Sequence, residues 1–461
     1  IVRYSRLETI RQYGCEKLEA SGELEQMRRR HLDYFLDFAE RGNRELRGPR
    51  SLEWTRRMDA EHNNLRAALG FAFSEKGVSD AVVRLLPAVG GFNGVWTTGS
   101  WKEGHYWVEK ALAYPNALPP TALRASLLFH SAVFDDYCPW EKQRSRFEES
   151  LAIFDALGEA YSVERAYLLM WLGFKLCYQL SERERGTRNM QEALRIFDDS
   201  GEKWGLGFAL NLYSGVIIDL DNDFNAAWAL NERGMEIARQ TGEQFLIAVF
   251  NDNFGYFNVR HGLYSEGQGY LEKALEVHRQ FQTLVFACQT LKWLGDAARG
   301  LNNYERAEAC YRESLAMVQD IGWRSYQAVV YLCLGTTLLH RNDVEQAIAY
   351  LQAALDSSRQ HTFRFIAYFV LDCLAGACAV RRKPYVAAQL FGAFDAQLDA
   401  LLAEGYTRHR LFDAIDTQTH EHFLSLARAQ LDEVIFEQRW QEGRALTQEE
   451  AIELALATIG T

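Results

Sequence analysis

Residues 291–318 read LKWLGDAARGLNNYERAEACYRESLAMV, and this stretch decides the fold. Its first apolar residues, Leu291, Leu294, Ala298 and Leu301, recur at intervals of three and four, the spacing of one face of an α-helix. Asn302 and Asn303 then break the pattern with residues that favour turns and helix caps. A second helical pattern follows, so the stretch predicts one helix over roughly 285–300, a tight turn, and another over roughly 303–320.

The pattern of the second helix repeats along the chain about every 40 residues. A Leu, or a Met or Phe in its place, marks eight positions: Leu112, Leu151, Leu194, Met235, Leu275, Leu315, Leu355 and Phe394. The steps between them are 39, 43, 41, 40, 40, 40 and 39 residues. Self-similarity at a fixed period of this size is the signature of a repeat architecture.

Small residues recur at the same period in the first helix of each unit. They are Gly173, Gly215, Gly255, Gly295, Gly335 and Ala375, and the last five are followed twelve residues later by Ala227, Gly267, Ala307, Ala347 and Ala387. A glycine inside a helix costs about 1 kcal/mol relative to alanine. The recurrence therefore predicts that two antiparallel helices approach closely at these points.

Each unit is therefore predicted to be a helical hairpin. Neither helix of a hairpin can bury its apolar stripe alone, but stacked hairpins bury each stripe against a neighbour. The 7 prolines among 461 residues also favour long uninterrupted helices. We expect an all-α chain built as a solenoid.

The spacing of small and bulky residues in these hairpins resembles the tetratricopeptide repeat. Gly295, Ala307, Tyr311 and Ser314 stand at its small, small, bulky and small positions, and Gly335, Ala347, Leu351 and Ala354 do the same in the next unit. The period of about 40 residues exceeds the usual 34, which implies longer helices. The resemblance covers roughly residues 82–405 and implies a right-handed superhelical solenoid of about eight hairpins with helical caps at both ends.

The flanking segments extend the resemblance. They read RYSRLETIRQYGCEKLEASGE (3–23), RRRHLDYFLDFAE (28–40), LRGPRSLEW (46–54) and AEHNNLRAAL (60–69) before the array, and LFGAFDAQLDAL (390–401) and FEQRWQEGRALTQEEAIELAL (436–456) at its end. In this order they resemble the region that follows the nucleotide-binding module in bacterial signal-transduction ATPases with tandem repeats. That family includes many LuxR-type and antibiotic-pathway transcriptional regulators.

This second resemblance implies a domain order and a larger parent protein. Residues 1–48 would be the end of a winged-helix-like module with a connecting helix, 49–81 an N-terminal helical cap, 82–405 the repeat array and 406–461 a C-terminal helical cap. A nucleotide-binding module is expected upstream in the parent protein. The present sequence contains no G-x-x-x-x-G-K-[ST] phosphate loop, so we expect no ATPase activity from it.

Composition and short motifs argue against several classes of function. The formal net charge of -12 opposes direct binding to nucleic acid or to anionic membranes. The 8 cysteines include no C-x-x-C pair and are expected as reduced core residues, which favours a cytoplasmic protein. His420-Glu421-His422 lacks the H-E-x-x-H spacing and is interpreted as an exposed helix face, so we expect no metal, no cofactor and no catalytic residue. Thr447 and Glu450 have the spacing of a capping box that begins the last helix.

The repeat register also predicts which side chains line the concave face of the solenoid. They are Asp219, Asp252, Tyr256, Gln289, Lys292, Asp296, Arg299 and Asp372. One interpretation is a groove of mixed charge that binds a peptide or polar ligand through charge-assisted hydrogen bonds. The other is a solvated inner surface in which these charges only pair with one another.

The leading functional hypothesis is a non-catalytic sensor region of a bacterial ATPase-type regulator. A protein or peptide partner, or a small inducer, would bind in the concave groove, and the attached ATPase would respond to the resulting change of curvature. The alternative hypothesis is a scaffold that mediates self-association or complex assembly without a small ligand.

Overall fold

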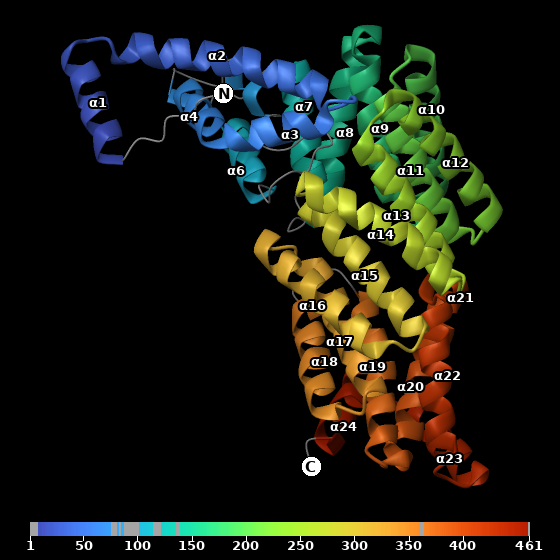
Figure 1. The fold of residues 1–461 in the computed structure, drawn as a ribbon. Coiled ribbons are helices and arrows are strands. Elements are labelled where there is room, and N and C mark those ends of the chain that lie inside the picture. The colour runs from blue at the N-terminus through green and yellow to red at the C-terminus, as the bar shows by residue number, and fades with distance from the viewer. Residues whose placement is uncertain are drawn as a thin grey trace.

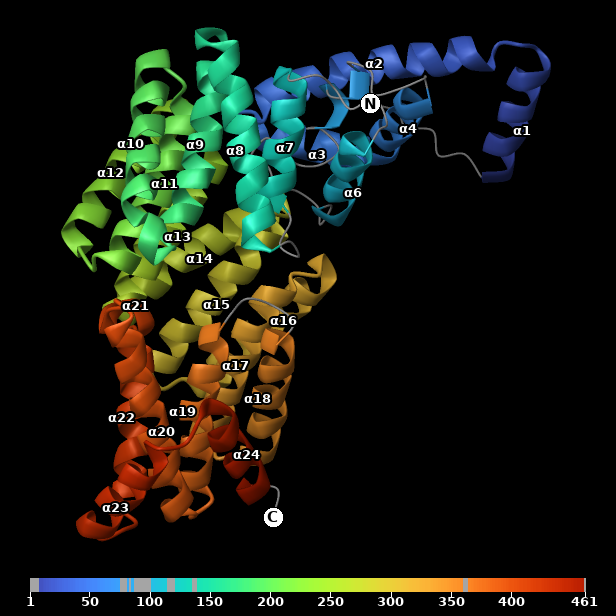
Figure 2. The same ribbon diagram turned by 180° about the vertical axis from the view of Figure 1, so that it is seen from behind.

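The computed structural model describes residues 8–74, 81–82, 84–86, 101–113, 121–134, 139–359 and 364–459. All regular secondary structure in these ranges is helical, and consecutive helices pack in pairs (Figures 1 and 2). The predicted all-α solenoid is confirmed. Within the described ranges, no helix is long and apolar enough to cross a membrane.

The helices fall into an N-terminal group, a series of hairpins and a C-terminal group. The first group is α1 (Glu8–Ala20), α2 (Leu24–Glu45), α3 (Ser51–Ala60), α4 (His62–Ser74) and α6 (Trp101–Leu112). The hairpins pair α7 (Ala122–Phe134) with α8 (Trp140–Leu157), α9 (Ser162–Cys177) with α10 (Arg183–Ser200), α11 (Lys203–Leu220) with α12 (Phe224–Thr241), α13 (Gln244–Arg260) with α14 (Tyr264–Phe281), α15 (Leu284–Gly300) with α16 (Tyr304–Ile321), α17 (Arg324–His340) with α18 (Val344–Arg359), and α19 (Arg364–Val380) with α20 (Pro384–Ala403). The last group is α21 (Arg408–Leu411), α22 (Ala414–Arg428), α23 (Glu433–Gly443) and α24 (Gln448–Ile459).

The turn inside each of five successive hairpins places one residue in the left-handed backbone region. These residues are 40 positions apart, with φ between 54° and 81°: Asn222, Gly262, Asn302, Asn342 and Arg382. The residue after the turn often caps the second helix. The side chain of Asp223 accepts from the backbone N–H of Ala226 at 2.9 Å, and that of Asn303 accepts from Arg306 at 3.2 Å. The 40-residue period of the sequence is therefore also the interval at which this left-handed turn recurs.

The recurring glycines mark close approaches between the helices of a hairpin, with one exception. A Cβ atom at Gly255 would lie 2.4 Å from Leu271, and one at Gly295 would lie 2.4 Å from the ring of Tyr311. Gly173 and Gly335 are similarly crowded. Gly215 has no atom within 4 Å of such a Cβ, so the expectation of a packing role is wrong for this glycine.

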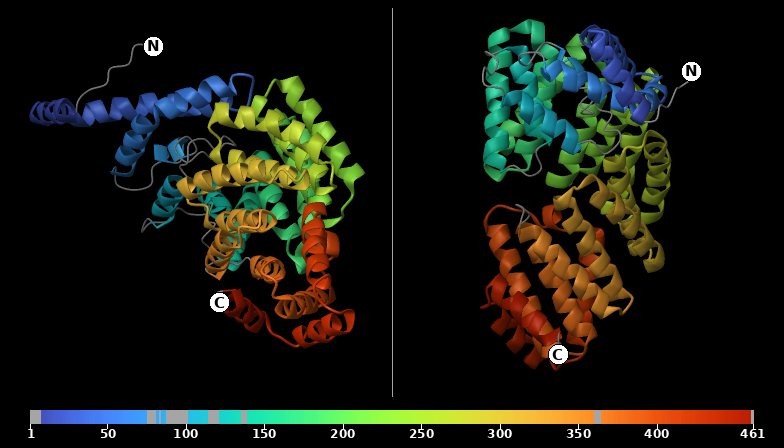
Figure 3. Two further views of the ribbon diagram at one scale, coloured as in Figure 1. Left: turned by 60° about the horizontal axis from the view of Figure 1, so that its bottom comes forward. Right: turned by 90° about the vertical axis from the view of Figure 1, so that its left-hand side faces the viewer.

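The first helices of the hairpins form a continuous inner layer. Each of α9, α11, α13, α15 and α17 contacts the next first helix along the array, ending at α19. Each second helix packs on its own partner and on the first helix of the next hairpin, which places the second helices outside. The stack curves, and Figure 3 shows the C-terminal helices beside its inner layer.

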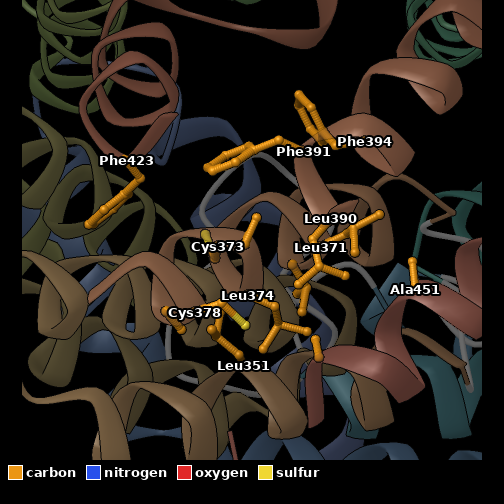
Figure 4. Close-up of a cluster of buried hydrophobic side chains, with 14 of the residues drawn as sticks. Leu351, Leu371, Cys373, Leu374, Cys378, Leu390, Phe391, Phe394, Phe423 and Ala451 are labelled. Atoms are coloured by element: carbon orange, nitrogen blue, oxygen red, sulfur yellow. The ribbon is translucent and has the colours of Figure 1, made fainter. Parts of the chain in front are cut away.

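The C-terminal helices close the array by burying apolar surface on its last hairpin. Phe423 of α22 and Ala451 of α24 lie in the same buried cluster as Leu371 and Phe391 (Figure 4). The predicted capping box before α24 is confirmed. Glu450 accepts from the N–H of Thr447 at 2.9 Å, and the Thr447 hydroxyl accepts from the N–H of Glu450 at 3.2 Å.

The N-terminal group is attached to the middle of the array as well as to its beginning. Arg47 lies over the rings of Tyr167 and Trp204, at 5.1 and 5.3 Å from their centroids, and donates to the Tyr167 hydroxyl at 3.2 Å. Helix α3 contacts α13 and α14. The chain therefore returns onto its own repeats from both ends.

Candidate functional site

A polar cluster lies on the inner layer where α9, α11 and α13 meet. Asp219 accepts hydrogen bonds from the hydroxyls of Tyr178 at 2.6 Å and Tyr256 at 2.5 Å. Arg260 donates to the Tyr256 oxygen at 3.2 Å and stands 3.8 Å from an Asp219 oxygen. Burial raises the pKa of Tyr256, so its hydroxyl remains a neutral donor. The structure thus brings the predicted residues Asp219 and Tyr256 together, and the Asp219 side chain stays 24% exposed.

A second polar cluster lies on α15 and contains three predicted residues. Lys292 Nζ is 2.6 Å from one oxygen of Asp296, and the Tyr311 hydroxyl donates to the other at 2.7 Å. Arg299 stands 4.0 Å from Asp296 and is almost fully buried. Burial alone lowers the pKa of Lys292, but the Asp296 carboxylate and the other acidic groups around Lys292 together outweigh it, and the net pKa is raised. These charges largely satisfy one another, as the second interpretation of the groove residues expected.

Asp252 and Gln289 differ from the other predicted residues. Asp252 is buried, with His278 Nε2 at 2.6 Å and the Thr290 hydroxyl at 2.7 Å from its two oxygens. It therefore joins the hairpins to each other and is not presented on the concave surface. Gln289 is half-buried on α15.

Asp372, on α19, pairs with a residue of the C-terminal group. His420 Nδ1 lies 2.7 Å from Asp372 Oδ1, and both residues are buried. His422 lies beside His340, with ring centroids 5.1 Å apart. The expectation that His420, Glu421 and His422 form an exposed helix face is wrong for His420, because α22 packs on α19. No group of three or more His, Cys, Asp or Glu in the described residues is arranged to hold a metal ion.

The concave face is crossed by a segment of the chain itself, Thr407–His420, which we call the strap. Its first residues contact α9, α11 and α13, and its later residues contact α15, α17 and α19. Arg410 donates to the carbonyl of Tyr178 at the end of α9 at 2.7 Å, and His409 Nε2 lies 3.1 Å from the carbonyl of Leu220 at the end of α11. Arg260 of α13 donates to the carbonyl of His409.

The second half of the strap continues across the remaining first helices. Asp416 Oδ1 lies 3.5 Å from Arg299 of α15. Thr419 Oγ1 lies 3.5 Å from His340 Nε2 at the end of α17, and His420 then reaches Asp372 of α19. The strap, which is helical over α21 and the first part of α22, therefore makes a polar contact to each first helix from α9 to α19.

The charges of the strap match the ends of the helices that it meets. The carbonyl end of a helix carries a partial negative charge, and α11 ends in the sequence DLDND (219–223). His409 lies at this end, and Arg410 donates to the carbonyl end of α9. Asp413 and Asp416 come next and lie near Arg260 and Arg299. Opposite charges therefore meet along the length of the strap.

The strap leaves two hollows on the concave face. An open cleft of about 640 Å³ lies where Arg260 and His261 face Arg408, His409 and Asp413. A cavity of about 40 Å³ lies between Arg299, Asp372 and Asp416, large enough for a single water molecule.

Sequence reasoning missed the strap as part of the site. The contact of Arg410 with Tyr178 spans 232 residues of sequence, and that of Arg299 with Asp416 spans 117. The available signal was the order of charge from Arg408 to Asp416, basic and then acidic. The sequence does not show what these residues contact. The curvature of the array brings His409 to the C-terminal end of α11, and Asp413 and Asp416 to Arg260 and Arg299.

The fold and its inner layer define a tetratricopeptide-like helical-repeat protein. A family model for the tetratricopeptide repeat matches residues 293–317, which lie within the stretch that decides the fold. The chain is also 24% identical over 412 residues to candidate HTH-type transcriptional regulators of Mycobacterium tuberculosis and Mycobacterium bovis. The match covers 83% of this chain and 43% of those proteins, so the chain spans less than half of their length.

Comparison with solved structures gives two further similarities. A Rap protein complexed with competence and sporulation factor has a TM-score of 0.52 at 12% identity, over 86% of this chain and 99% of that one. A signal transduction ATPase with numerous domains and a tetratricopeptide repeat sensor, from Pyrococcus horikoshii, has a TM-score of 0.42 at 13% identity, over 79% of this chain and 53% of that one. The likeness to the Rap protein is one of fold. The repeat match and the similarity to regulators confirm the resemblance inferred from the sequence.

Proposed function

We propose that this chain is the sensing region of a bacterial transcriptional or signalling regulator and binds a protein or peptide partner on its concave face. The observation that supports the proposal is the strap, since it shows that this face accepts a polypeptide segment by one polar contact to each inner helix. The sequence similarity to transcriptional regulators supports the regulatory context.

The chemistry of the face suits binding better than catalysis. Its charged groups are paired within the protein, as Lys292 is with Asp296, and its tyrosine hydroxyls donate to carboxylates. The partly exposed Asp219 carboxylate and the carbonyls at the helix ends can also accept directional hydrogen bonds from a partner. We therefore assign the region no reaction of its own, and the nucleotide-binding module is expected elsewhere in the parent protein.

Binding would act by selecting one curvature of the array. A ligand shifts a conformational equilibrium only by its difference in affinity for the two states. The strap joins α9 to α19, so a ligand that changes its contacts changes how these ends are held. Modules attached to the array would respond to that shift.

We also propose a reducing compartment for the protein. The described cysteines are free thiols, and Cys333 and Cys373 are buried. Burial raises the pKa of each of these two thiols to about 12, which keeps them protonated and unreactive. This is the state expected of core cysteines in the cytoplasm.

The test compares the inner and outer faces of the array. A partner captured with the chain as bait is identified by mass spectrometry and then titrated calorimetrically against purified variants. Asp219→Asn keeps the shape of an inner side chain and removes its charge, whereas Asp198→Asn does the same to the exposed pair with Arg233 on the outer layer. We expect Asp219→Asn to weaken binding by about tenfold, the value of one charged hydrogen bond, and Asp198→Asn to leave it unchanged. Equal binding by both variants, or a loss only with Asp198→Asn, would refute the proposal.

A further inference from the structure

The contacts of the strap define a more specific binding surface at one end of the concave face. We propose that the α9–α11–α13 end binds a peptide segment with closely spaced basic residues, and that Thr407–Arg410, which we call the arm, occupies this surface from within the same chain. The inference rests on the function proposed above and names the class of partner. A partner would bind by displacing the arm.

The first argument is the chemistry of the surface. The carbonyls of Tyr178 and Leu220 accept from Arg410 and face His409, and both lie at the carbonyl ends of inner helices. Asp219 lies among these groups with part of its side chain exposed. Helix ends and carboxylates together favour cations, and the arm places the Arg410 guanidinium there, with His409 beside it.

The second argument is the way in which the arm is held. On one side Tyr406 packs against Phe365, and on the other Phe412 packs against Phe369 and Phe394. The arm between these apolar anchors touches α9, α11 and α13 through polar contacts. Groups released from such contacts can hydrogen-bond to water instead, so a charged contact holds the arm by only about 1.5–3 kcal/mol. The arm can therefore leave its surface while the anchors keep α22 in place.

The third argument is the space beside the arm. The open cleft of about 640 Å³ lies against Arg408 and His409 and extends to His261. Asn222 and Thr417 also line it. A displaced arm or an incoming side chain can enter this cleft without moving the inner helices.

An arm fixed at both ends competes strongly with any partner. A tethered segment acts at an effective concentration on the order of millimolar. An external segment must therefore make more contacts with the surface than the arm does, or the contacts of the arm with the surface must first be weakened. The arm thereby sets a threshold for binding.

The experiment uses a synthetic peptide of the sequence EGYTRHRLFD (404–413), labelled with fluorescein, and the full chain. In the variant His409→Ser/Arg410→Ser the arm loses its two side-chain contacts to the helix ends and keeps only the contact of Arg260 with the carbonyl of residue 409, while its surface stays intact. We expect the peptide to bind this variant at least about tenfold more tightly than the wild-type chain, since each charged hydrogen bond contributes about 1.5–3 kcal/mol. A control peptide with the same two serines is expected to bind neither protein. Equal affinity for both proteins, or no binding, would overturn the inference.

A second measurement uses the wild-type chain and does not depend on the folding of the variant. Excess peptide is expected to speed hydrogen exchange at Thr407–Arg410 and to leave α19 and α20 unchanged. Unchanged exchange of the arm at a saturating peptide concentration would also overturn the inference. Neither measurement needs an external partner, so their failure leaves the comparison of Asp219→Asn with Asp198→Asn to decide the proposed function separately.

Discussion

His420 of α22 and Asp372 of α19 share a hydrogen bond of 2.7 Å between Nδ1 and Oδ1, with side chains only 8% and 9% exposed. Burial alone lowers the pKa of His420, but the hydrogen bond and charge of Asp372 outweigh it and raise the pKa above 6.5. A carboxylate of the strap, Asp416, contacts Arg299 on the array. Burial raises the pKa of Asp416 to about 7, although about a third of its side chain is exposed. The attachment of α22 to the array is therefore sensitive to protons.

The first prediction is that α22 is held more firmly as the pH falls from about 8 to about 6. A raised histidine pKa gives stability that is complete below its unfolded value of about 6.5 and is lost as pH rises through the folded value. The raised pKa of Asp416 acts in the same direction, because docking favours its protonated form. Native-state hydrogen exchange, corrected for its intrinsic pH dependence, should show α22 amides gaining protection relative to α17.

The control for this prediction removes the titrating group. In His420→Gln the remaining pH dependence should be smaller, since His340 has a pKa lowered to about 3 by burial and stays neutral throughout this range. Asp395 also faces His420, and its pKa is raised by burial, so it does not reverse the trend. Protection of α22 that grows with rising pH would contradict the assignment.

The second prediction concerns two glycines that look equivalent in the sequence. Gly255→Ala should destabilise the chain by about 1–3 kcal/mol, because its Cβ would lie 2.4 Å from Leu271 in a packed interface. Gly215→Ala should instead be neutral or stabilising by up to about 1 kcal/mol, because alanine is the better helix former and no atom lies within 4 Å. Urea unfolding of both variants checks the pair, and equal shifts would show that the close approach at Gly255 is not energetically important.

The third prediction concerns the left-handed turn residue of the last hairpin. Arg382 has φ of 55° and is exposed, whereas the equivalent position two and three hairpins earlier holds Asn302 and Gly262. Arg382→Gly should stabilise the chain by about 1 kcal/mol, since glycine enters this region without steric cost. Gly262→Ala should destabilise it by a similar amount. Thermal melting of the two variants should give shifts of opposite sign.

The fourth prediction separates Asp252 from the groove residues. Asp252→Ala should cost about 3 kcal/mol, because it leaves the buried groups of His278 and Thr290 without their acceptor. Asp198→Ala, which removes a carboxylate from an exposed pair, should change stability by less than about 0.5 kcal/mol. If the Asp252→Ala chain were fully stable but no longer bound its partner, Asp252 would belong to the binding surface after all.

Most of the fold was readable from the sequence because the forces that make a hairpin are local. The helix pattern before and after Asn302 predicted α15 and α16 to within a few residues of their ends, and the 40-residue period extended that result along the array. Leu301 was expected on the apolar face of its helix, yet it is 44% exposed, because the helix ends at Gly300. Errors of this kind arise at helix ends, where the helical period stops determining which way a side chain points.

The site was less predictable because its partners come from distant hairpins. The register grouped Lys292, Asp296 and Arg299, and these residues lie on one helix with their side chains in contact. It could not show that His420 would be buried, since the acceptor Asp372 is on a different helix 48 residues away. Such pairs can be assigned only when the path of the superhelix is known. Local patterns in a single sequence do not specify that path.

The strap also limits how this protein can change in length. Its polar contacts extend over the hairpins from α9 to α19, so its length is matched to a fixed number of repeat units. Adding or deleting one unit by recombination would carry every later contact past its acceptor at once. A solenoid whose repeats contact only their neighbours can gain or lose a unit without breaking such long-range contacts. In this protein, a change in the number of units would require a matching change in the strap.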